Sequence, residues 1–216
     1  MDPLALIVTL VAAYLLGSIP TGFLVAKARG VDIRAVGSGN IGATNAFRVL
    51  GAAAGSFVLF VDGLKGCAAS AWASGLVFEF VAGRGSAPAS TPDAVAILAG
   101  ISAILGHNYT CWLGFKGGKG IATSAGVFFA LAPLAAGIAL GSWVAVFVVS
   151  RFVSVASLAA SVVLPAAVWF SDAGALLKWV TTAAGALAIY KHRSNIERLL
   201  AGTESRISFT QTGPSK

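Results

Sequence analysis

The stretch HNYTCWLGFKGGKGIAT, residues 107 to 123, separates two apolar segments with two lysines and four glycines. Glycine lets the backbone come close to a ligand and take a positive φ, and lysine supplies a point charge. The stretch therefore predicts a site that wraps an anion, with phosphate as the expected anion. The candidate residues within it are His107, Lys116, Gly117, Gly118, Lys119 and Gly120.

The same stretch also has two other interpretations. A Gly- and Lys-rich loop after a membrane helix is also typical of a plain cytoplasmic loop, whose positive charge only orients the protein. A Walker A nucleotide loop is not favoured, because Leu113 stands where that motif requires its first glycine. The anion site and the orienting loop stay open at this point.

The composition is that of an integral membrane protein. Apolar residues make up 57% and charged residues 11%, whereas soluble domains carry about a quarter charged residues. The apolar runs are continuous, which favours an all-α bundle. The net charge of +7 would suggest nucleic acid in a soluble protein, but membrane topology accounts for it here, and we expect no nucleic acid partner.

The apolar runs predict seven transmembrane helices. Because about 20 apolar residues cross a bilayer, the stretch 121–150 is too long for one span and should form two short helices that meet near Pro133. The other spans are 4–26, 49–82, 94–106, 152–171 and 174–190. Most lysines and arginines then share one side, which predicts an outside N-terminus and a cytoplasmic C-terminus. We expect one bundle domain over 1–204 and a flexible tail over 205–216.

The polar segment from Lys27 to Arg48 is predicted to be a cytoplasmic loop. It contains the spacing G-x-G-x-x-G at 37–42, but a membrane helix precedes it where a dinucleotide site needs a strand, so the match is treated as false. Short donor side chains stand among the glycines, and Arg48 is expected at the start of the next helix. The candidates are Ser38, Gly39, Asn40, Thr44, Asn45 and Arg48.

An acid and a base interrupt the second span. Asp62 and Lys65 are spaced i, i+3 and can pair on one helix face. Such an intramembrane pair faces the bundle interior, either as structural glue or as a proton or anion site.

Two further clusters are expected on the cytoplasmic side. Ser154 with Ser157, and His192 with Asn195, each share a helix face by i, i+3 spacing. Together with the two glycine-rich segments they predict one site that is rich in donors, almost lacks acceptors, and holds more than one phosphate. The chain shows neither metal-ligand spacing nor a nucleophile–base pair, so no metal or cofactor is expected.

Three segments resemble the bacterial integral-membrane acyl-phosphate:glycerol-3-phosphate acyltransferases. They are GSGNIGATN at 37–45 with Arg48, GHNYTCWLGFKGGKGIAT at 106–123, and KHRSNIERLLAGTE at 191–204. The resemblance implies a multi-pass protein of the bacterial cytoplasmic membrane. It also implies transfer of a fatty acyl group from acyl phosphate to the 1-hydroxyl of glycerol 3-phosphate, which gives lysophosphatidate and inorganic phosphate.

The resemblance also implies roles for the candidates. Ser38, Gly39, Asn40, Thr44 and the glycines near Lys116 correspond to the acyl-phosphate side; Arg48, Lys119, Ser157, His192 and Asn195 correspond to the glycerol-phosphate side. Either His192 or a substrate phosphate could take the hydroxyl proton. The acyl chain is expected between helices, where Gly17 and Gly22 leave room. A small phosphate or organophosphate transporter is the alternative function.

Overall fold

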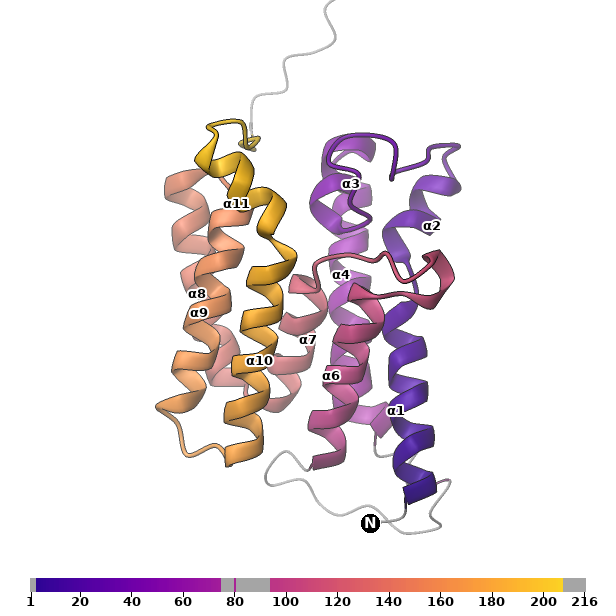
Figure 1. The fold of residues 1–216 in the computed structure, drawn as a ribbon, viewed down its shortest axis with the longest axis vertical. Coiled ribbons are helices and arrows are strands. Elements are labelled where there is room, and N and C mark those ends of the chain that lie inside the picture. Colours follow the sequence, from indigo (N-terminus) through magenta and orange to yellow (C-terminus); the bar gives the residue numbers. More distant parts are fainter. Residues whose placement is uncertain (1–2, 75–79, 81–93, 208–216) are drawn as a thin grey trace, which may run out of the picture.

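The computed structural model describes residues 3–74, 80 and 94–207, and these residues form helices and no strand (Figure 1). In chain order the helices are α1 (Pro3–Ser18), α2 (Thr21–Lys27), α3 (Ala43–Leu50), α4 (Ala52–Ala68), the π-helix η1 (Ala69–Ala73), α6 (Ala94–Asn108), the 3-10 helix η2 (Cys111–Leu113), α7 (Ile121–Leu131), α8 (Pro133–Ser150), α9 (Val153–Trp169), α10 (Ala175–Lys191) and α11 (Arg193–Leu200).

Four stretches of the described residues are long and apolar enough to cross a membrane. They are Pro3–Lys27, Ala52–Trp72, Ala94–Leu113 and Pro133–Ser150, and Ile121–Leu131 and Val153–Trp169 are shorter apolar helices. The expected all-α membrane bundle is therefore confirmed at this level. The count of seven crossings and the direction of the termini stay predictions.

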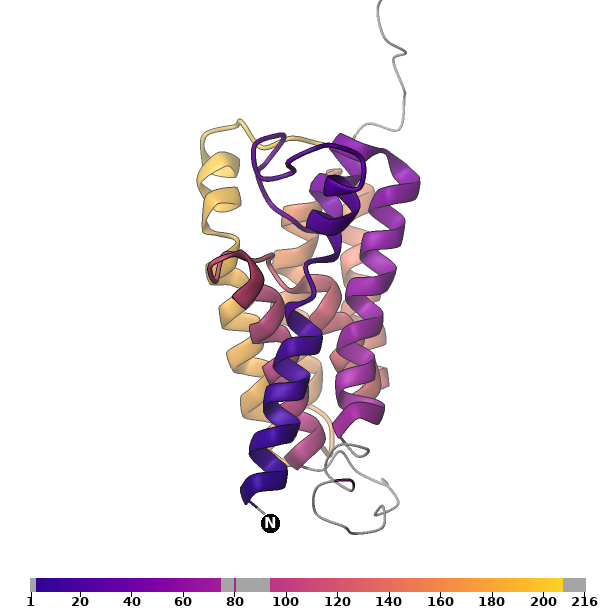
Figure 2. The ribbon, with the colours of Figure 1, turned by 90° about the vertical axis from the view of Figure 1, so that its right-hand side faces the viewer.

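The long helices run side by side in two groups (Figure 1, Figure 2). In one group α1 packs against α6 and α3 against α4, and in the other α8, α9 and α10 pack in series. The helix α7 lies between the groups and contacts α4 on one side and α8 on the other.

Small residues let backbones touch within the first group. A Cβ on Gly17 would lie 2.1 Å from the carbonyl oxygen of Ala103, and a Cβ on Gly22 would lie 1.9 Å from that of Ile41. The expectation that Gly17 and Gly22 leave room for an acyl chain is therefore wrong, because a neighbouring backbone fills the space beside each glycine.

Prolines set two of the helix boundaries. Pro133 is the first residue of α8, so α7 and α8 meet at Ala132 as predicted. Pro20 interrupts the predicted first span, because it cannot donate a backbone hydrogen bond, and α1 ends at Ser18. The carbonyl oxygen of Ile19 in this break accepts a hydrogen bond from Lys65 Nζ at 2.9 Å.

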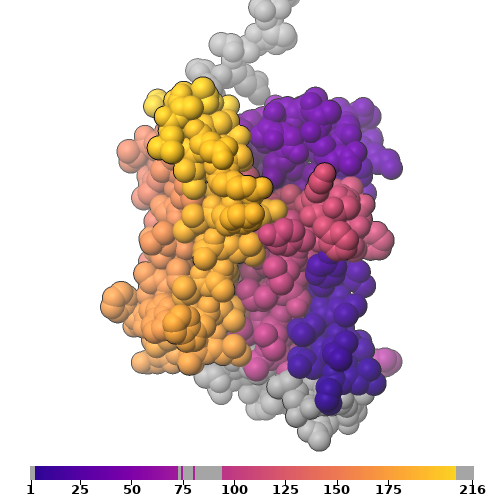
Figure 3. Space-filling model, in the orientation of Figure 1, coloured from indigo at the N-terminus to yellow at the C-terminus, as the bar shows by residue number. Residues whose placement is uncertain are grey.

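The segment from Lys27 to Arg48 differs from the predicted loop. The helix α3 begins at Ala43, so Arg48 lies in its second half and not at the start of the next membrane helix. The element before the glycine-rich loop is the helix α2, which agrees with rejecting the dinucleotide fingerprint. At the same end of the molecule, the surface of α11 lies beside that of α3 and the loop before it (Figure 3).

The beginning of the predicted tail is attached to the bundle. The carbonyl oxygen of Ser205 accepts a hydrogen bond from Arg48 Nη2 at 3.0 Å, and the Ile207 N–H donates to the carbonyl oxygen of Arg151 at 3.0 Å. Residues 208–216 lie outside the described part, so the division into a 1–204 domain and a 205–216 tail stays a prediction.

Candidate active site

A cavity of about 280 Å³ lies between the two helix groups. The helix α7 has only 11 residues, about 16 Å of length, so it ends partway along the bundle and leaves space beyond its N-terminus. The polar side chains that line the cavity are Asn40, Thr44, Arg48, Asp62, His107, Lys119, Ser124, Ser154, Ser157, Ser161, His192, Asn195 and Glu204. The cavity therefore joins residues from both groups and from all four predicted clusters.

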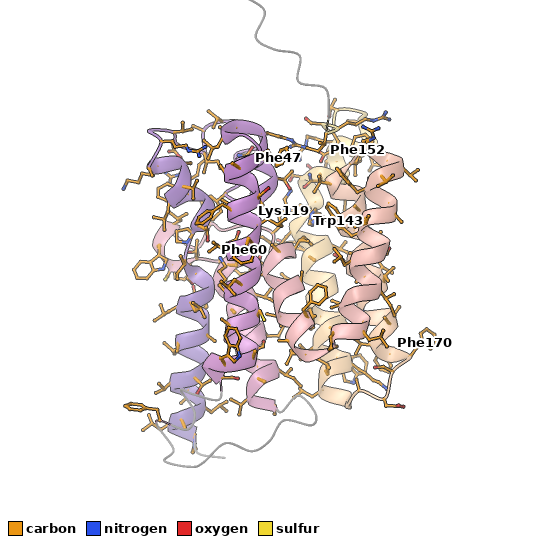
Figure 4. The ribbon with its side chains drawn as sticks, turned by 180° about the vertical axis from the view of Figure 1, so that it is seen from behind. Phe47, Phe60, Lys119, Trp143, Phe152 and Phe170 are labelled. Carbon is orange, nitrogen blue, oxygen red and sulfur yellow. The ribbon has the colours of Figure 1, made fainter. Side chains whose placement is uncertain are left out.

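Lys119 projects into the space between the groups (Figure 4). Gly120, with φ 80°, turns the chain from the central loop into α7, a conformation that glycine adopts without strain. The Lys119 ammonium donates a hydrogen bond to Asn195 Oδ1. Burial and, to a smaller extent, the nearby Arg198 lower the pKa of Lys119 to about 8, although Glu204 acts in the opposite direction.

Glu204 is an acceptor at the centre of the site. Its Oε1 accepts hydrogen bonds from Ser154 Oγ at 2.8 Å and from Asn195 Nδ2 at 2.6 Å. Its Oε2 accepts one from Arg198 Nε at 2.7 Å. The prediction of a site almost without acceptors is thus wrong, because this carboxylate links α9 to α11 and, through Asn195, to Lys119.

Replacing Glu204 by Gln should destabilise the protein. The amide would turn one acceptor into a donor that faces Ser154, Asn195 or Arg198, and losing a charged hydrogen bond costs about 1.5–3 kcal/mol. We expect a lower thermal unfolding midpoint in detergent, whereas Glu197→Gln, a change on α11 outside the cavity lining, should leave it unchanged. Equal midpoints for the two variants would contradict this role.

The same network predicts a pH dependence of stability. Burial raises the pKa of Glu204, but the hydrogen bonds from Asn195, Arg198 and Ser154 outweigh it and hold the pKa below the ordinary 4.5. A lowered folded pKa stabilises the protein above the unfolded pKa, and this contribution is lost as pH falls through the folded value. The midpoint difference between wild type and Glu204→Gln should therefore shrink on acidification below 4.5.

The N-terminus of α7 offers free backbone donors. No side chain caps it, and the first intrahelical bond runs from Ser124 N to the carbonyl oxygen of Gly120, at 2.7 Å. The first-turn residues Ile121 and Ala122 line the cavity. Because a helix N-terminus carries partial positive charge and unpaired N–H groups, this wall of the cavity suits an anion.

His192 presents one tautomer. Its Nδ1 lies 2.7 Å from the carbonyl oxygen of Ala188, which can only accept, so Nδ1 carries the proton and Nε2 is free to accept. Burial lowers the pKa of His192 to about 4, although the bond to Ala188 raises it. The ring is therefore neutral near pH 7.

The deeper part of the cavity is apolar. Phe128, Leu140 and Leu164 line it, and Trp143 donates from Nε1 to Ser157 Oγ at 3.2 Å where polar and apolar walls meet. A second groove of about 260 Å³ shares Thr44 and Trp143 with the cavity and continues past the exposed Phe47 of α3 and the half-buried Phe147 of α8. Together they can hold a charged head and an apolar chain.

Several predicted residues do not line the cavity. Asn45 is buried and used by the fold: Oδ1 accepts the Ser38 N–H at 2.9 Å, and Nδ2 donates to the carbonyl oxygens of Ile33 and Val36. Ser38 is exposed and Gly39 half-exposed beside this wall, and Lys116 is exposed. The structure therefore does not bring Ser38, Gly39, Asn45 and Lys116 into the cavity lining.

Gly117 and Gly118 seat the central loop behind the cavity wall. Their N–H groups donate to the carbonyl oxygens of Asn108 at 3.2 Å and of His107 at 3.0 Å. A Cβ on Gly118 would lie 2.1 Å from His107 Nε2, so only glycine fits there.

Among the described residues no group of three His, Cys, Asp or Glu side chains could hold a metal. The absence of a cofactor stays a prediction.

Comparison with known proteins identifies the family. Residues 7–202 match the family model described as glycerol-3-phosphate acyltransferase. The chain belongs to this family.

Individual relatives agree with the family match. The glycerol-3-phosphate acyltransferase of Geobacter metallireducens is 50% identical over 200 residues, covering 93% of this chain and 96% of the relative, and that of Geotalea daltonii is 44% identical over 199 residues, covering 92% and 96%. The crystal structure of PlsY (YgiH), an integral membrane glycerol 3-phosphate acyltransferase in its glycerol 3-phosphate form, is 37% identical with a TM-score of 0.83, covering 94% of this chain and 96% of that one. This chain is thus a multi-pass membrane protein of the acyltransferase family.

Sequence patterns predicted most of the polar residues that line the cavity, but not Glu204. Glu204 lies six residues after Arg198, and its role as an acceptor depends on how the segment after α11 folds back. Asp62 also lines the cavity, and its pair with Lys65 was predicted to face the bundle interior, as structural glue or as a proton or anion site.

Proposed function

We propose that this protein transfers a fatty acyl group from acyl phosphate to the 1-hydroxyl of glycerol 3-phosphate. The products are lysophosphatidate and inorganic phosphate. The observation that carries the proposal is a single cavity whose cationic, donor-rich end joins an apolar depth. That combination suits a substrate with a phosphate at one end and a hydrocarbon chain at the other.

Two cations bind the phosphate of glycerol 3-phosphate. Arg48 contributes a planar fork of donors from α3, and Lys119 a point charge from the central loop. Asn195 orients Lys119 through its Oδ1 and is itself fixed by Glu204. Ser157 lies on the same cavity wall, with its Oγ held by Trp143.

The acyl phosphate lies against the opposite donors. Asn40 and Thr44 line that wall, Gly120 opens α7, and the free N–H groups of its first turn face the same space. Ser38 and Gly39 stand in the adjoining loop and bind from its edge. The acyl chain extends into the apolar depth past Phe128 and Leu140.

The chemistry needs positioning more than a nucleophilic side chain. The 1-hydroxyl oxygen bonds to the acyl carbon, the bond from that carbon to the phosphate oxygen breaks, and inorganic phosphate leaves. His192 Nε2 accepts the hydrogen bond of the hydroxyl and orients it. Because the pKa of His192 is about 4, and a phosphate monoester has a second pKa of about 6, a substrate phosphate is the stronger base and takes the proton.

A transfer assay tests this function. Purified protein in liposomes receives acyl phosphate and labelled glycerol 3-phosphate, and thin-layer chromatography follows labelled lysophosphatidate. We expect product and inorganic phosphate in equal amounts. Labelled substrate that enters the vesicles without forming product would instead indicate the transporter alternative, which the family match does not support.

The bound phosphate should need a charged Lys119, which predicts a pH profile. Because the pKa of Lys119 is lowered to about 8, its charge is lost above that pH, and kcat/KM for glycerol 3-phosphate should fall there. Lys119→Arg, which stays charged, should remove this fall. A wild-type kcat/KM that stays level up to 10.5, the ordinary lysine value, would contradict the assignment.

We place the protein in the bacterial cytoplasmic membrane with the cavity mouth facing the cytoplasm. The end of the bundle that carries α3 and α11 holds exposed basic residues, including Arg34 and Arg193, while the α9–α10 turn at the other end carries Asp172. With α1 and α2 taken as one crossing, and α4, α6, α7, α8, α9 and α10 as one each, the chain crosses seven times. The N-terminus is then outside.

Cysteine labelling tests this orientation. In a Cys67→Ala, Cys111→Ala background, single cysteines at Ala35 and Ala201, both exposed, should resist an impermeant thiol reagent in intact spheroplasts and react after permeabilisation. A cysteine at Ser171, exposed in the α9–α10 turn, should react without permeabilisation. Labelling of Ala35 and Ala201 from opposite sides would contradict the topology and a shared site.

A further inference from the structure

A buried charged cluster lies beneath the central loop and has no part in the chemistry above. Asp62 and Lys65 on α4 are 1% and 4% exposed, and the distance from Lys65 Nζ to Asp62 Oδ1 is 2.8 Å. Thr21 Oγ1 donates to the same oxygen at 2.9 Å. The expected ion pair is therefore formed, and its surroundings show what it holds.

The Lys65 ammonium uses its three protons on three different elements. It donates to Asp62 on α4, to the carbonyl oxygen of Ile19 in the α1–α2 break at 2.9 Å, and to His107 Nδ1 on α6 at 2.9 Å. An ammonium group has three donors and no acceptor, so His107 Nδ1 must accept and its proton must reside on Nε2. The ion pair thus fixes the tautomer and the plane of the His107 ring.

His107 contacts the loop that carries Lys119. The carbonyl oxygen of His107 accepts the Gly118 N–H at 3.0 Å, and His107 Nε2 points to the space beside Gly118 Cα that a side chain would fill. Gly118 is buried against the ring, and the next residue is Lys119. A ring that turned or changed tautomer would move the backbone from which Lys119 enters the cavity.

We propose that Asp62 and Lys65 are positioning residues: Lys65 holds His107 in its Nε2–H tautomer, and His107 seats Gly118 so that Lys119 reaches the glycerol phosphate. The inference rests on the proposed function for its kinetic consequence. If the pair only stabilised the packing of the helices, the contact between Asp62 and Lys65 would be enough. In this structure Lys65 also donates a hydrogen bond to His107 Nδ1. Moving a binding group by about 1 Å can cost roughly 100-fold in rate.

The kinetic experiment removes both charges at once. A single Lys65→Met change would leave the Asp62 carboxylate buried and unpaired and could prevent folding, whereas loss of both partners is often tolerated. The test variant is therefore Asp62→Asn with Lys65→Met. The matched control is Asp32→Asn with Arg34→Met, which removes the exposed ion pair of the first loop, 2.9 Å long.

We expect the test variant to fold, with KM for glycerol 3-phosphate raised about 10-fold and KM for acyl phosphate changed far less, because only the Lys119 side is displaced. The control pair should leave both KM values unchanged. A folded test variant with wild-type KM for glycerol 3-phosphate would overturn the inference and leave the pair as packing.

A spectroscopic readout decides the tautomer independently of activity. The chain has two histidines, so ¹⁵N-histidine in a His192→Gln background reports on His107 alone. With the native ion pair, Nδ1 should resonate as an unprotonated nitrogen and Nε2 as a protonated one, and Asp62→Asn with Lys65→Met should give a mixture. A protonated Nδ1 with the native pair would overturn the inference. Absence of acyl transfer by the wild type would overturn the proposed function alone, since the spectrum still decides the tautomer.

Discussion

Arg48→Ala should lower kcat/KM for glycerol 3-phosphate by roughly 10- to 100-fold, because a hydrogen bond to a charged group contributes about 1.5–3 kcal/mol. The guanidinium lies at the cavity mouth on α3, and its one described hydrogen bond goes from Nη2 to the carbonyl oxygen of Ser205. The side chain is exposed, so its loss should cost little folding stability.

Arg34→Ala is the control for this prediction. Arg34 is exposed on the same side of the first group, pairs with Asp32 and does not line the cavity. We expect kcat/KM of Arg34→Ala for glycerol 3-phosphate to equal that of the wild type. A variant Arg48→Ala with near wild-type kcat/KM, or equal losses in the two arginine variants, would remove Arg48 from the phosphate site.

Lys119→Gln should raise KM for glycerol 3-phosphate by about 10- to 100-fold, with a smaller effect on KM for acyl phosphate. Glutamine removes the charge of Lys119 but keeps a polar, hydrogen-bonding side chain, and Asn195 stays bonded to Glu204. Steady-state kinetics with each substrate varied in turn measures the two constants.

Lys116→Gln is a matched control in the same loop. Both lysines lie in the central loop, but Lys116 is exposed outside the cavity and Lys119 lies within it. We expect Lys116→Gln to change neither KM. A larger effect at Lys116, or a larger effect of Lys119→Gln on acyl phosphate, would reverse the assignment of the loop.

The sequence predicted the elements of the fold well where apolar runs or prolines marked them. Pro133 marked the boundary between α7 and α8, and the spacing of Asp62 and Lys65 predicted the ion pair. The start of α3 at Ala43 was missed, because the glycines before it are typical of loops and give no signal for a helix of 8 residues.

The site was predicted as a set of residue types, but not as a geometry. Lys116 and Lys119 look alike in the sequence, and only the turn at Gly120 decides which of them enters the cavity. Asn45 has the composition of a binding residue, yet its amide is used to hold the backbone at Ile33, Val36 and Ser38. Such choices depend on contacts between distant segments, which local sequence patterns do not encode.

The most direct measurement of the central claim is the contact between bound phosphate and Lys119. Protein with ¹⁵Nζ-lysine is reconstituted in lipid with glycerol 3-phosphate, and solid-state NMR records the dipolar coupling between phosphorus and nitrogen. We predict a strong coupling that disappears in Lys119→Arg and persists in Lys116→Arg and Lys191→Arg. A coupling that persists in Lys119→Arg and disappears in Lys116→Arg would place the phosphate outside the cavity and contradict the account.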